Sequence, residues 1–432
     1  MKLIKSLMKQ AAIAAILLVF AAGSAQARIE GIAATAFSLT ARQGHISTAE
    51  GNSIYAWGYA NGTGLMQYPG VTMIVNQGDT VTVTLRNALP VRAGNVSIVF
   101  PGQKVTASGG VTGLLTQEAP PDGVTTVTYT FTATDPGTYL YHSGTNPDLQ
   151  VEMGLVGALI VRPAGFGHMM PTAYGHMDSA YTHGLEYLFL LTEMDARIHD
   201  LVETRGPAAL AATDYLSNYF PSYWFINGRT APDTMFRAFA PWLPTQPYNS
   251  MPMMHPGDKL LMRVIGAGRH LHPFHYHGNH ARIIAIDGKL LSSAPGQGAD
   301  LSNEQFTIQS VPGRTYDAIF EWTGKGLGWD IYGHTSVSDP IAPNEYEPDH
   351  GKPFPVILPD QQDLTFGGMY SGSPFLGTLG TLPPGEGGLN PHAGFAYMWH
   401  SHTEKEMTNF DIFPGGMMTM LVIVPHDVVI EH

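Results

Sequence analysis

Residues 139–143 read YLYHS and lead into GLVGALIVRP at residues 154–163, while residues 397–401 read YMWHS and lead into GGMMTMLVIVP at residues 415–425. The two stretches share the order of an aromatic segment, a His-Ser pair and a Gly-rich entry to an apolar strand. Such self-similarity within one chain indicates a structural unit that is used twice. The repeat therefore predicts two domains of the same fold.

Short segments of alternating apolar and polar residues support the same conclusion. Gly-Asp precedes VTVTL at residues 81–85 in the first half and KLLMRVI at residues 259–265 in the second. Residues 125–132 (TTVTYTFT) and 281–286 (ARIIAI) have the same character. Strands of this kind, separated by Gly- and Pro-rich turns, predict an all-β chain of two Greek-key β-sandwich domains. The best short helix candidate is residues 206–219.

The repeat and the composition together predict the domain boundaries. We place the first domain at residues 28–165, a linker rich in Gly, Pro, His and Met at residues 166–184, and the second domain at residues 185–432. A Pro- and Gly-rich insertion at about residues 334–390 interrupts the second domain. Irregular stretches of this length are usually functional covers or disordered insertions, and we favour a cover over the second domain's site.

Residues 1–27 have the layout of a secretory signal peptide. Three lysines precede an uncharged apolar run at residues 11–23, and the small-residue sequence AQA stands before Arg28. That run is too short to span a membrane, and no later segment approaches about 20 continuous apolar residues. We therefore predict a protein without a membrane span that is exported to the periplasm or the extracellular space.

Charge and cysteine content exclude several function classes. The formal net charge of -13 argues against nucleic acid as a partner. The chain has no cysteine, which excludes disulfides, thiolate metal sites and cysteine nucleophiles. A bound metal would therefore be held by His, Met, carboxylate or backbone oxygen.

Histidines gather in the segment RHLHPFHYHGNHA at residues 269–281. His275 and His277 are two residues apart, so on a strand they project from one face, and His400 and His402 have the same spacing. Two such pairs on adjacent strands would bring four imidazoles together at one or two metal ions. Imidazoles suit copper and zinc, and copper has the higher intrinsic affinity. The alternative is that these histidines are surface or core residues satisfied by backbone carbonyls.

These segments resemble motifs of the multicopper oxidase family. Residues 272–278 (HPFHYHG) are similar to the HPxHxHG motif, and residues 399–418 are similar to the C-terminal HCHxxxH segment. Residues 139–161 resemble the YHSH segment with its following strand, and residues 223–234 (YWFINGRTAPDT) resemble a recurring domain opening. The resemblance implies cupredoxin-like domains and copper as the cofactor. It also implies a type 1 role for His272, a type 2 role for His275, and type 3 roles for His142, His277, His400 and His402.

Departures from the family pattern limit what the resemblance implies. Ser401 stands at the position of the type 1 cysteine, and Glu406 stands at the second type 1 histidine. Gly144 replaces the second His of the HSH motif, and residues 97–99 read SIV where the family has HxH. A blue copper site is therefore excluded, and half of the family's trinuclear cluster is in doubt.

We expect a copper-dependent oxidoreductase that acts on a small-molecule or metal-ion substrate, with dioxygen as a candidate, through an all-imidazole site without a blue relay. The site would consist mainly of His275, His277, His400 and His402. Glu406 is the candidate catalytic carboxylate, either as a ligand, as a general base or as a partner that orients an imidazole. A solvated loop carboxylate is the alternative for Glu406.

Two-domain relatives commonly form trimers with metals between subunits. The resemblance therefore implies a homotrimer in which His142 comes from a neighbouring subunit. Two other hypotheses stay open at this point. The chain is either a non-enzymatic copper-binding or copper-homeostasis protein on an oxidase scaffold, or a purely structural protein that binds no stoichiometric copper.

Overall fold

The chain is described by a computed structural model that covers residues 29–165, 171–353, 372–376 and 394–430, apart from the single residues 326, 333, 335, 344, 425 and 427. For residues 372–376 only the backbone is described. The predicted signal peptide, five residues of the predicted linker and most of the predicted insertion therefore lie outside the described residues.

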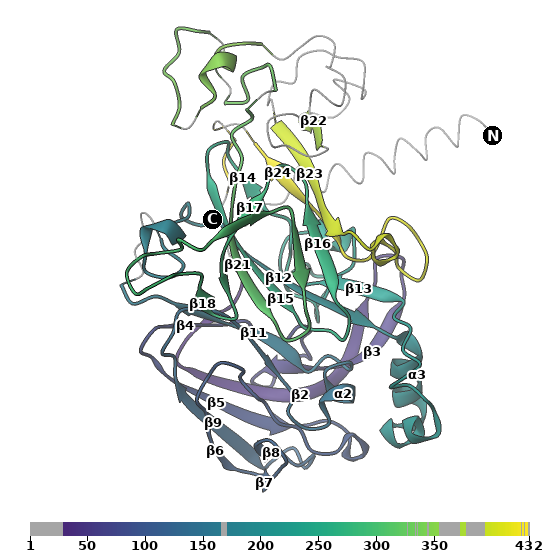
Figure 1. Cartoon of the computed structure of the whole chain (residues 1–432). Helices are drawn as coiled ribbons and strands as arrows, with labels where there is room; N and C mark the ends of the chain where they lie inside the picture. The colour runs from purple at the N-terminus through teal and green to yellow at the C-terminus, as the bar shows by residue number, and fades with distance from the viewer. Residues whose placement is uncertain are drawn as a thin grey trace, which may run out of the picture.

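The first half of the chain forms an N-terminal sandwich of two sheets (Figure 1). One sheet has the order β3-β2-β5-β9-β6, with bounds Ser53–Asn61, Ala36–Ser47, Thr80–Asn87, Thr126–Thr132 and Thr106–Gly109. The other has the order β1-β4-β11-β10, with bounds Ile32–Ala33, Met73–Asn76, Val156–Arg162 and Gly137–His142. A small hairpin of β7 (Val111–Thr112) and β8 (Gln117–Glu118) is separate. Alternate residues of β5 and β9 are buried, as their sequence pattern predicts.

The second half forms a C-terminal sandwich of larger sheets. One sheet has the order β13-β12-β15-β21-β17-β18, with bounds Tyr223–Ile226, Glu186–Met194, Lys259–Gly266, Thr315–Glu321, Ala281–Ile286 and Lys289–Leu290, and β19 (Asn303–Gln305) pairs with β17. The other has the order β14-β24-β23-β16-β20, with bounds Met253–Met254, Met418–Ile423, Gly394–Ser401, His272–Tyr276 and Thr307–Ser310, and β22 (Gly372–Leu376) pairs with β23.

The sequence repeat has the same strand pairing in both sandwiches. β11 pairs antiparallel with β10 and parallel with β4, just as β24 pairs antiparallel with β23 and parallel with β14. Likewise β5 lies between parallel β2 and antiparallel β9, just as β15 lies between parallel β12 and antiparallel β21. This equivalence confirms the all-β fold class that the repeat predicts.

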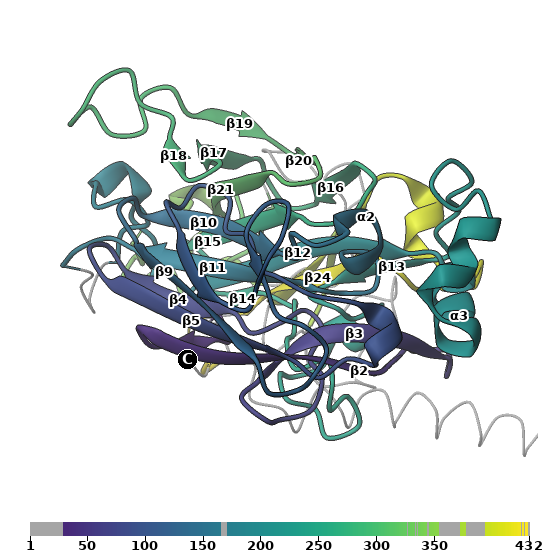
Figure 2. The same cartoon turned by 90° about the horizontal axis from the view of Figure 1, so that it is seen from below.

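Strands β10 and β15, one from each sandwich, lie beside each other (Figure 2). Apolar side chains pack between the two sandwiches. Leu140 of β10 and Ile160 of β11 belong to one buried cluster with Leu188 and Leu190 of β12. The same strands carry residues of the two sandwich cores on their other faces, because side chains alternate along a strand. The four large sheets therefore stack in sequence, with the sheet of β16 and β23 on the side away from the N-terminal sandwich.

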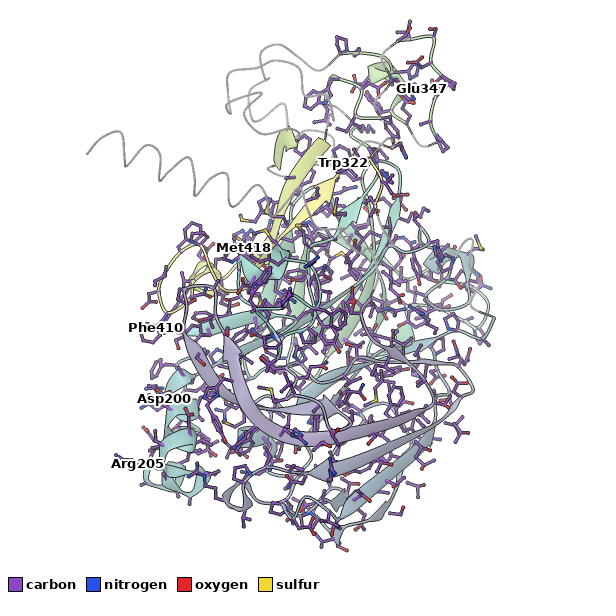
Figure 3. All side chains as sticks on the ribbon, turned by 180° about the vertical axis from the view of Figure 1, so that it is seen from behind. Asp200, Arg205, Trp322, Glu347, Phe410 and Met418 are labelled. Atoms are coloured by element: carbon purple, nitrogen blue, oxygen red, sulfur yellow. The ribbon has the colours of Figure 1, made fainter. Side chains whose placement is uncertain are left out.

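The main helix begins earlier than the sequence predicts. Helix α3 spans Ala196–Arg205, while residues 207–212 of the predicted helix form only a 3₁₀ turn (Figure 3). The side chain of Asp195 caps α3 by accepting a hydrogen bond from the backbone N–H of Arg197. Gly206, at φ 84°, ends the helix in a conformation that favours glycine. Capping at both ends thus decided the position of the helix, and the apolar run that follows did not.

Candidate metal centre

Strand pairing brings the two HxH segments together on the outer sheet of the C-terminal sandwich. β16 pairs antiparallel with β23, and His275 lies directly opposite His400. Phe274 and Tyr276 alternate with the histidines and point into the core. His275 and His277 therefore project from the opposite, outer face of the sheet, where His400 also projects.

The imidazoles of this group, which we call the histidine cluster (His275, His277, His400 and His402), are in contact. The Nε2 atoms of His277 and His400 are 3.2 Å apart. One ring nitrogen each of His275, His277 and His400 lies within 4.8 Å of the other two. The ring centre of His402 is 4.9 Å from that of His275, but the His402 side chain is 54% exposed. The structure thus brings together the ring nitrogens of His275, His277 and His400, with the ring of His402 beside them.

The other ring nitrogens are held by neighbouring groups. Nδ1 of His400 donates to the backbone carbonyl of Ser401 at 2.7 Å, which leaves its Nε2 as the unprotonated atom in the neutral ring. Nδ1 of His275 lies 2.8 Å from the hydroxyl of Thr307 on β20. Such partners fix the orientation of an imidazole ligand and the atom that carries its lone pair.

Burial keeps two members of the cluster neutral. Burial, reinforced by the neighbouring imidazoles, lowers the pKa of His275 to about 4. Burial also lowers the pKa of His400 to about 4. Both rings are therefore uncharged at neutral pH, with a lone pair available to a metal. Together with His277, whose ring nitrogen converges with theirs, they form an imidazole donor set that fits copper.

His142 is held in the same way as His400 but lies apart from the histidine cluster. It ends β10 in the N-terminal sandwich, and its Nδ1 lies 2.9 Å from the carbonyl oxygen of Ser143. Among the described residues it joins no group of three or more converging metal-ligating side chains. The structure of one chain therefore does not place His142 at the candidate centre.

The positions beside His142 that depart from the family pattern contact one another. The backbone N–H of Gly144 donates to the hydroxyl of Ser97 at 3.2 Å, and the Thr145 hydroxyl donates to the same oxygen at 2.9 Å. A Cβ at Gly144 would approach Val99 to 2.6 Å, so the space of a second histidine is already filled. The N-terminal sandwich thus contributes no HxH pair.

His272 lies on the inner face of the sheet, between two carboxylates. Its Nδ1 is 2.8 Å from Glu406 Oε2, and its Nε2 is 2.8 Å from Glu193 Oε2. The Ser401 hydroxyl donates to the same Glu406 oxygen at 2.6 Å. All of these side chains are buried or nearly so. We call Glu193, His272 and Glu406 the buried triad.

His272 was predicted to be a copper ligand, but the structure places it in the buried triad and not in the histidine cluster. Burial alone would lower the pKa of His272, but hydrogen bonds from its ring to Glu193 and Glu406 outweigh it and raise the pKa to about 9. At neutral pH both ring nitrogens are therefore protonated, and neither has a lone pair for a metal. Glu406 faces this inner side, where it bonds to His272 and Ser401, and its predicted catalytic role stays a prediction.

Sequence reasoning missed two functional neighbours. Glu193 is the one carboxylate near the end of the wholly buried strand EYLFLLTEM, and a charged residue in such a strand signals a buried partner. Thr307 gives no signal in the sequence, because its contact with His275 depends on the pairing of β16 with β20. The sequence did indicate the position of His272. Residues three apart on a strand project to opposite faces of the sheet, so His272 is expected to face away from His275.

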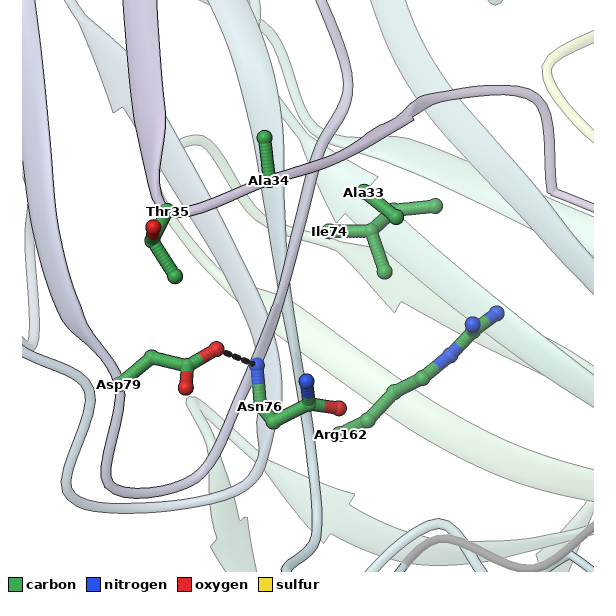
Figure 4. A pocket seen from close by; sticks show the side chains of 7 residues that line it. All are labelled: Ala33, Ala34, Thr35, Ile74, Asn76, Asp79 and Arg162. Carbon is green, nitrogen blue, oxygen red and sulfur yellow. Dashed lines mark hydrogen bonds between the residues drawn. The ribbon is translucent and has the colours of Figure 1, made fainter.

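A separate cavity lies in the N-terminal sandwich. It has a volume of about 350 Å³ and is lined by residues at one end of the N-terminal sandwich, among them Thr35, Asp79 and Arg162 (Figure 4). Within it, Asp79 accepts a hydrogen bond from the backbone N–H of Asn76 at 2.8 Å. No histidine lines this cavity, so it is not the candidate metal centre.

Comparison with known sequences finds a family match in the N-terminal sandwich. Residues 41–165 match the family model described as multicopper oxidase. The curated iron transport multicopper oxidase fetC of Epichloe festucae (strain E2368) is 29% identical over 228 residues, which are 51% of this chain and 30% of that relative. The matched stretch therefore spans about a third of the length of the curated relative.

Comparison with solved structures extends the likeness over nearly the whole chain. The blue copper oxidase from Nitrosomonas europaea is 20% identical with a TM-score of 0.53, over 90% of this chain and 85% of that one. The multicopper oxidase mgLAC is 18% identical with a TM-score of 0.53, over 92% and 87% of the two chains. These likenesses establish the fold. In the described part of the chain, no helix has the length and apolar character needed to cross a membrane.

Proposed function

We infer that this chain, which belongs with the multicopper oxidases by its family match and its fold, is a copper-dependent oxidoreductase with an all-imidazole copper site. The observation that carries this proposal is the convergence of His275, His277 and His400 on the outer face of one sheet. Copper bound there would supply one-electron chemistry with a small substrate or with dioxygen.

The residues around the cluster would hold and expose the metal. The Ser401 carbonyl and the Thr307 hydroxyl hold the rings of His400 and His275. His402 lies at the open side of the cluster, where its Nδ1 is 3.1 Å from the exposed carboxylate of Glu404. A small molecule or metal ion could therefore reach the site from solvent beside His402.

The missing cysteine decides the route of electrons. Ser401 points to the inner face of the sheet and donates its hydroxyl proton to Glu406. A hydroxyl hydrogen-bonded in this way gives no thiolate path between a remote electron donor and the histidine cluster. We therefore propose that substrate transfers electrons at the imidazole site itself, without a blue relay.

Location and assembly are part of the same proposal. The layout of residues 1–27 supports export to the periplasm or the extracellular space. The resemblance to two-domain relatives, together with the position of His142 outside the histidine cluster, supports a homotrimer in which His142 of one chain completes the cluster of another. Gel filtration with light scattering tests the assembly, and a monomer at all concentrations would overturn it.

A second candidate function is copper binding without turnover. The contacts of Gly144 with Ser97 and Val99 favour it. These positions lack the HxH pair and the second histidine of the HSH motif, so the chain lacks ligands for a full oxygen-reducing cluster. Such a protein would store or carry copper on an oxidase scaffold.

Turnover by the copper-loaded protein distinguishes the two functions. We expect oxygen consumption with phenols or reduced metal ions, or reduction of nitrite, at rates above those of free copper at the same concentration. The metal-stripped protein and the His277→Ala variant serve as controls and should be inactive. Tight copper binding with no turnover across these substrates would instead support the copper-handling function.

A further inference from the structure

A second group of metal-ligating side chains lies in the irregular segment that follows β21. Asp330, His334, Glu345 and His350 offer four ligand atoms that all lie within 4.8 Å of one another. We call them the distal cluster. Their segment projects beyond the C-terminal sandwich, where Figure 3 labels the exposed Glu347. None of the four belongs to the histidine cluster or to the buried triad.

Four of the separations between these ligand atoms are compatible with a tetrahedral shell. Nδ1 of His334 is 2.9 Å from Asp330 Oδ2 and 3.2 Å from Glu345 Oε1. Nδ1 of His350 is 3.8 Å from the same Asp330 oxygen and 2.7 Å from the same Glu345 oxygen. Zinc bonds of about 2.0–2.1 Å in tetrahedral geometry put neighbouring ligand atoms about 3.3 Å apart. The observed spacing brackets that value.

In three of these side chains, the polar atom that is not part of the distal cluster is hydrogen-bonded to a backbone group. Asp330 Oδ1 accepts from the N–H of Tyr332 at 2.8 Å, and Glu345 Oε2 accepts from the N–H of Ala342 at 2.7 Å. Nε2 of His350 is 3.0 Å from the carbonyl oxygen of Asp339, so it donates, and Nδ1 carries the lone pair of the neutral ring. Outer contacts of this kind orient metal ligands.

The charge and burial of the distal cluster also indicate that it holds a positive charge. The Asp330 and Glu345 side chains are 0% and 2% exposed, and among the described residues neither forms an ion pair with lysine or arginine. Two buried carboxylates need compensating positive charge. Either two imidazolium rings or one divalent cation between neutral rings would supply it.

We propose that the distal cluster binds a divalent transition-metal ion, zinc above others, which fixes residues 328–352 to the C-terminal sandwich. Two imidazoles and two carboxylate oxygens within 4.8 Å of one another suit a structural zinc site. The described residues of this segment form no long strand or helix, so the ion would supply much of its rigidity. The site is independent of the proposed copper chemistry.

Zinc titration of the full chain in a His400→Ala background tests this proposal, because that variant disables the histidine cluster. After removal of metals by a chelator, we expect one zinc ion per chain by elemental analysis. Co²⁺ in its place should give the visible absorption of a tetrahedral site. Adding Glu345→Gln or His350→Ala should weaken zinc binding by about 10-fold or more.

Glu347→Gln is the matched control, since this carboxylate is exposed in the same segment and lies outside the distal cluster. It should bind zinc like the parent. Circular dichroism checks that each variant is folded. Absence of stoichiometric zinc in the parent, or equal zinc affinity in the parent and in folded Glu345→Gln, would overturn the proposal and leave an ion-pair cluster only. Copper binding by the chain with an intact histidine cluster is unaffected by either result.

Discussion

His400→Ala is expected to lower the affinity of the chain for copper by about 100-fold or more and to abolish turnover. His400 is the central member of the histidine cluster, because it lies opposite His275 in the strand pairing and its Nε2 is 3.2 Å from that of His277. Loss of a ligand should cost at least as much as loss of an outer partner, which is about 10–100-fold. Competitive titration with a copper chelator measures the change.

His45→Ala is the matched control for this prediction. His45 is an exposed imidazole on β2 that pairs with Glu203 and lies far from the cluster in the fold. Its removal should leave copper affinity unchanged, because the loss of this exposed imidazole alters only the surface of the protein. Equal copper affinity in folded His400→Ala and in the parent would contradict the assignment of the histidine cluster as the copper site.

His272→Ala is expected to destabilise the protein by about 3–5 kcal/mol, because it leaves Glu193 and Glu406 as buried carboxylates without their shared cation. Urea unfolding at pH 7 measures the loss. Copper affinity should stay unchanged in the folded variant, since the buried triad lies on the opposite face of the sheet from the histidine cluster. A destabilisation below about 1 kcal/mol would contradict the triad as a structural ion network.

The same triad predicts a pH dependence of stability. The pKa of His272 is raised from 6.5 to about 9, so the folded state holds a proton that the unfolded state releases between these values. Its contribution is fully present below pH 6.5 and is lost as the pH rises to about 9, a change of about 3 kcal/mol. A variant with His272→Leu, Glu193→Gln and Glu406→Gln should lack this part of the pH dependence and should recover most of the stability lost in His272→Ala.

The repeat in the sequence was sufficient to predict the fold because each copy keeps its own strand pairing. The segments after Gly78-Asp79 and Gly257-Asp258 became β5 and β15, which occupy equivalent places in their sheets. The common face of each histidine pair could also be predicted, since the two-residue spacing of His275 and His277 places both side chains on one side of a strand. Local alternation is a short-range property, and it survives in the folded chain.

What the sequence could not predict depends on contacts between distant segments. Glu193 meets His272 across the two sheets of the C-terminal sandwich, 79 residues away in the chain. The distal cluster draws its four ligands from turns rather than from strands, so no periodicity relates Asp330 to His350. The prediction for His272 followed the resemblance, and its contacts with Glu193 and Glu406 could not be read from the spacing of the histidines.

Electron paramagnetic resonance combined with visible absorption of the copper-loaded protein tests the central claim most directly. The claim is that copper is held by imidazoles on the outer face of the C-terminal sandwich, while the type 1 position is a buried ion triad. It predicts stoichiometric copper with a type 2 resonance and no intense blue absorption. Intense blue absorption, or the absence of stoichiometric copper in the folded chain, would contradict it.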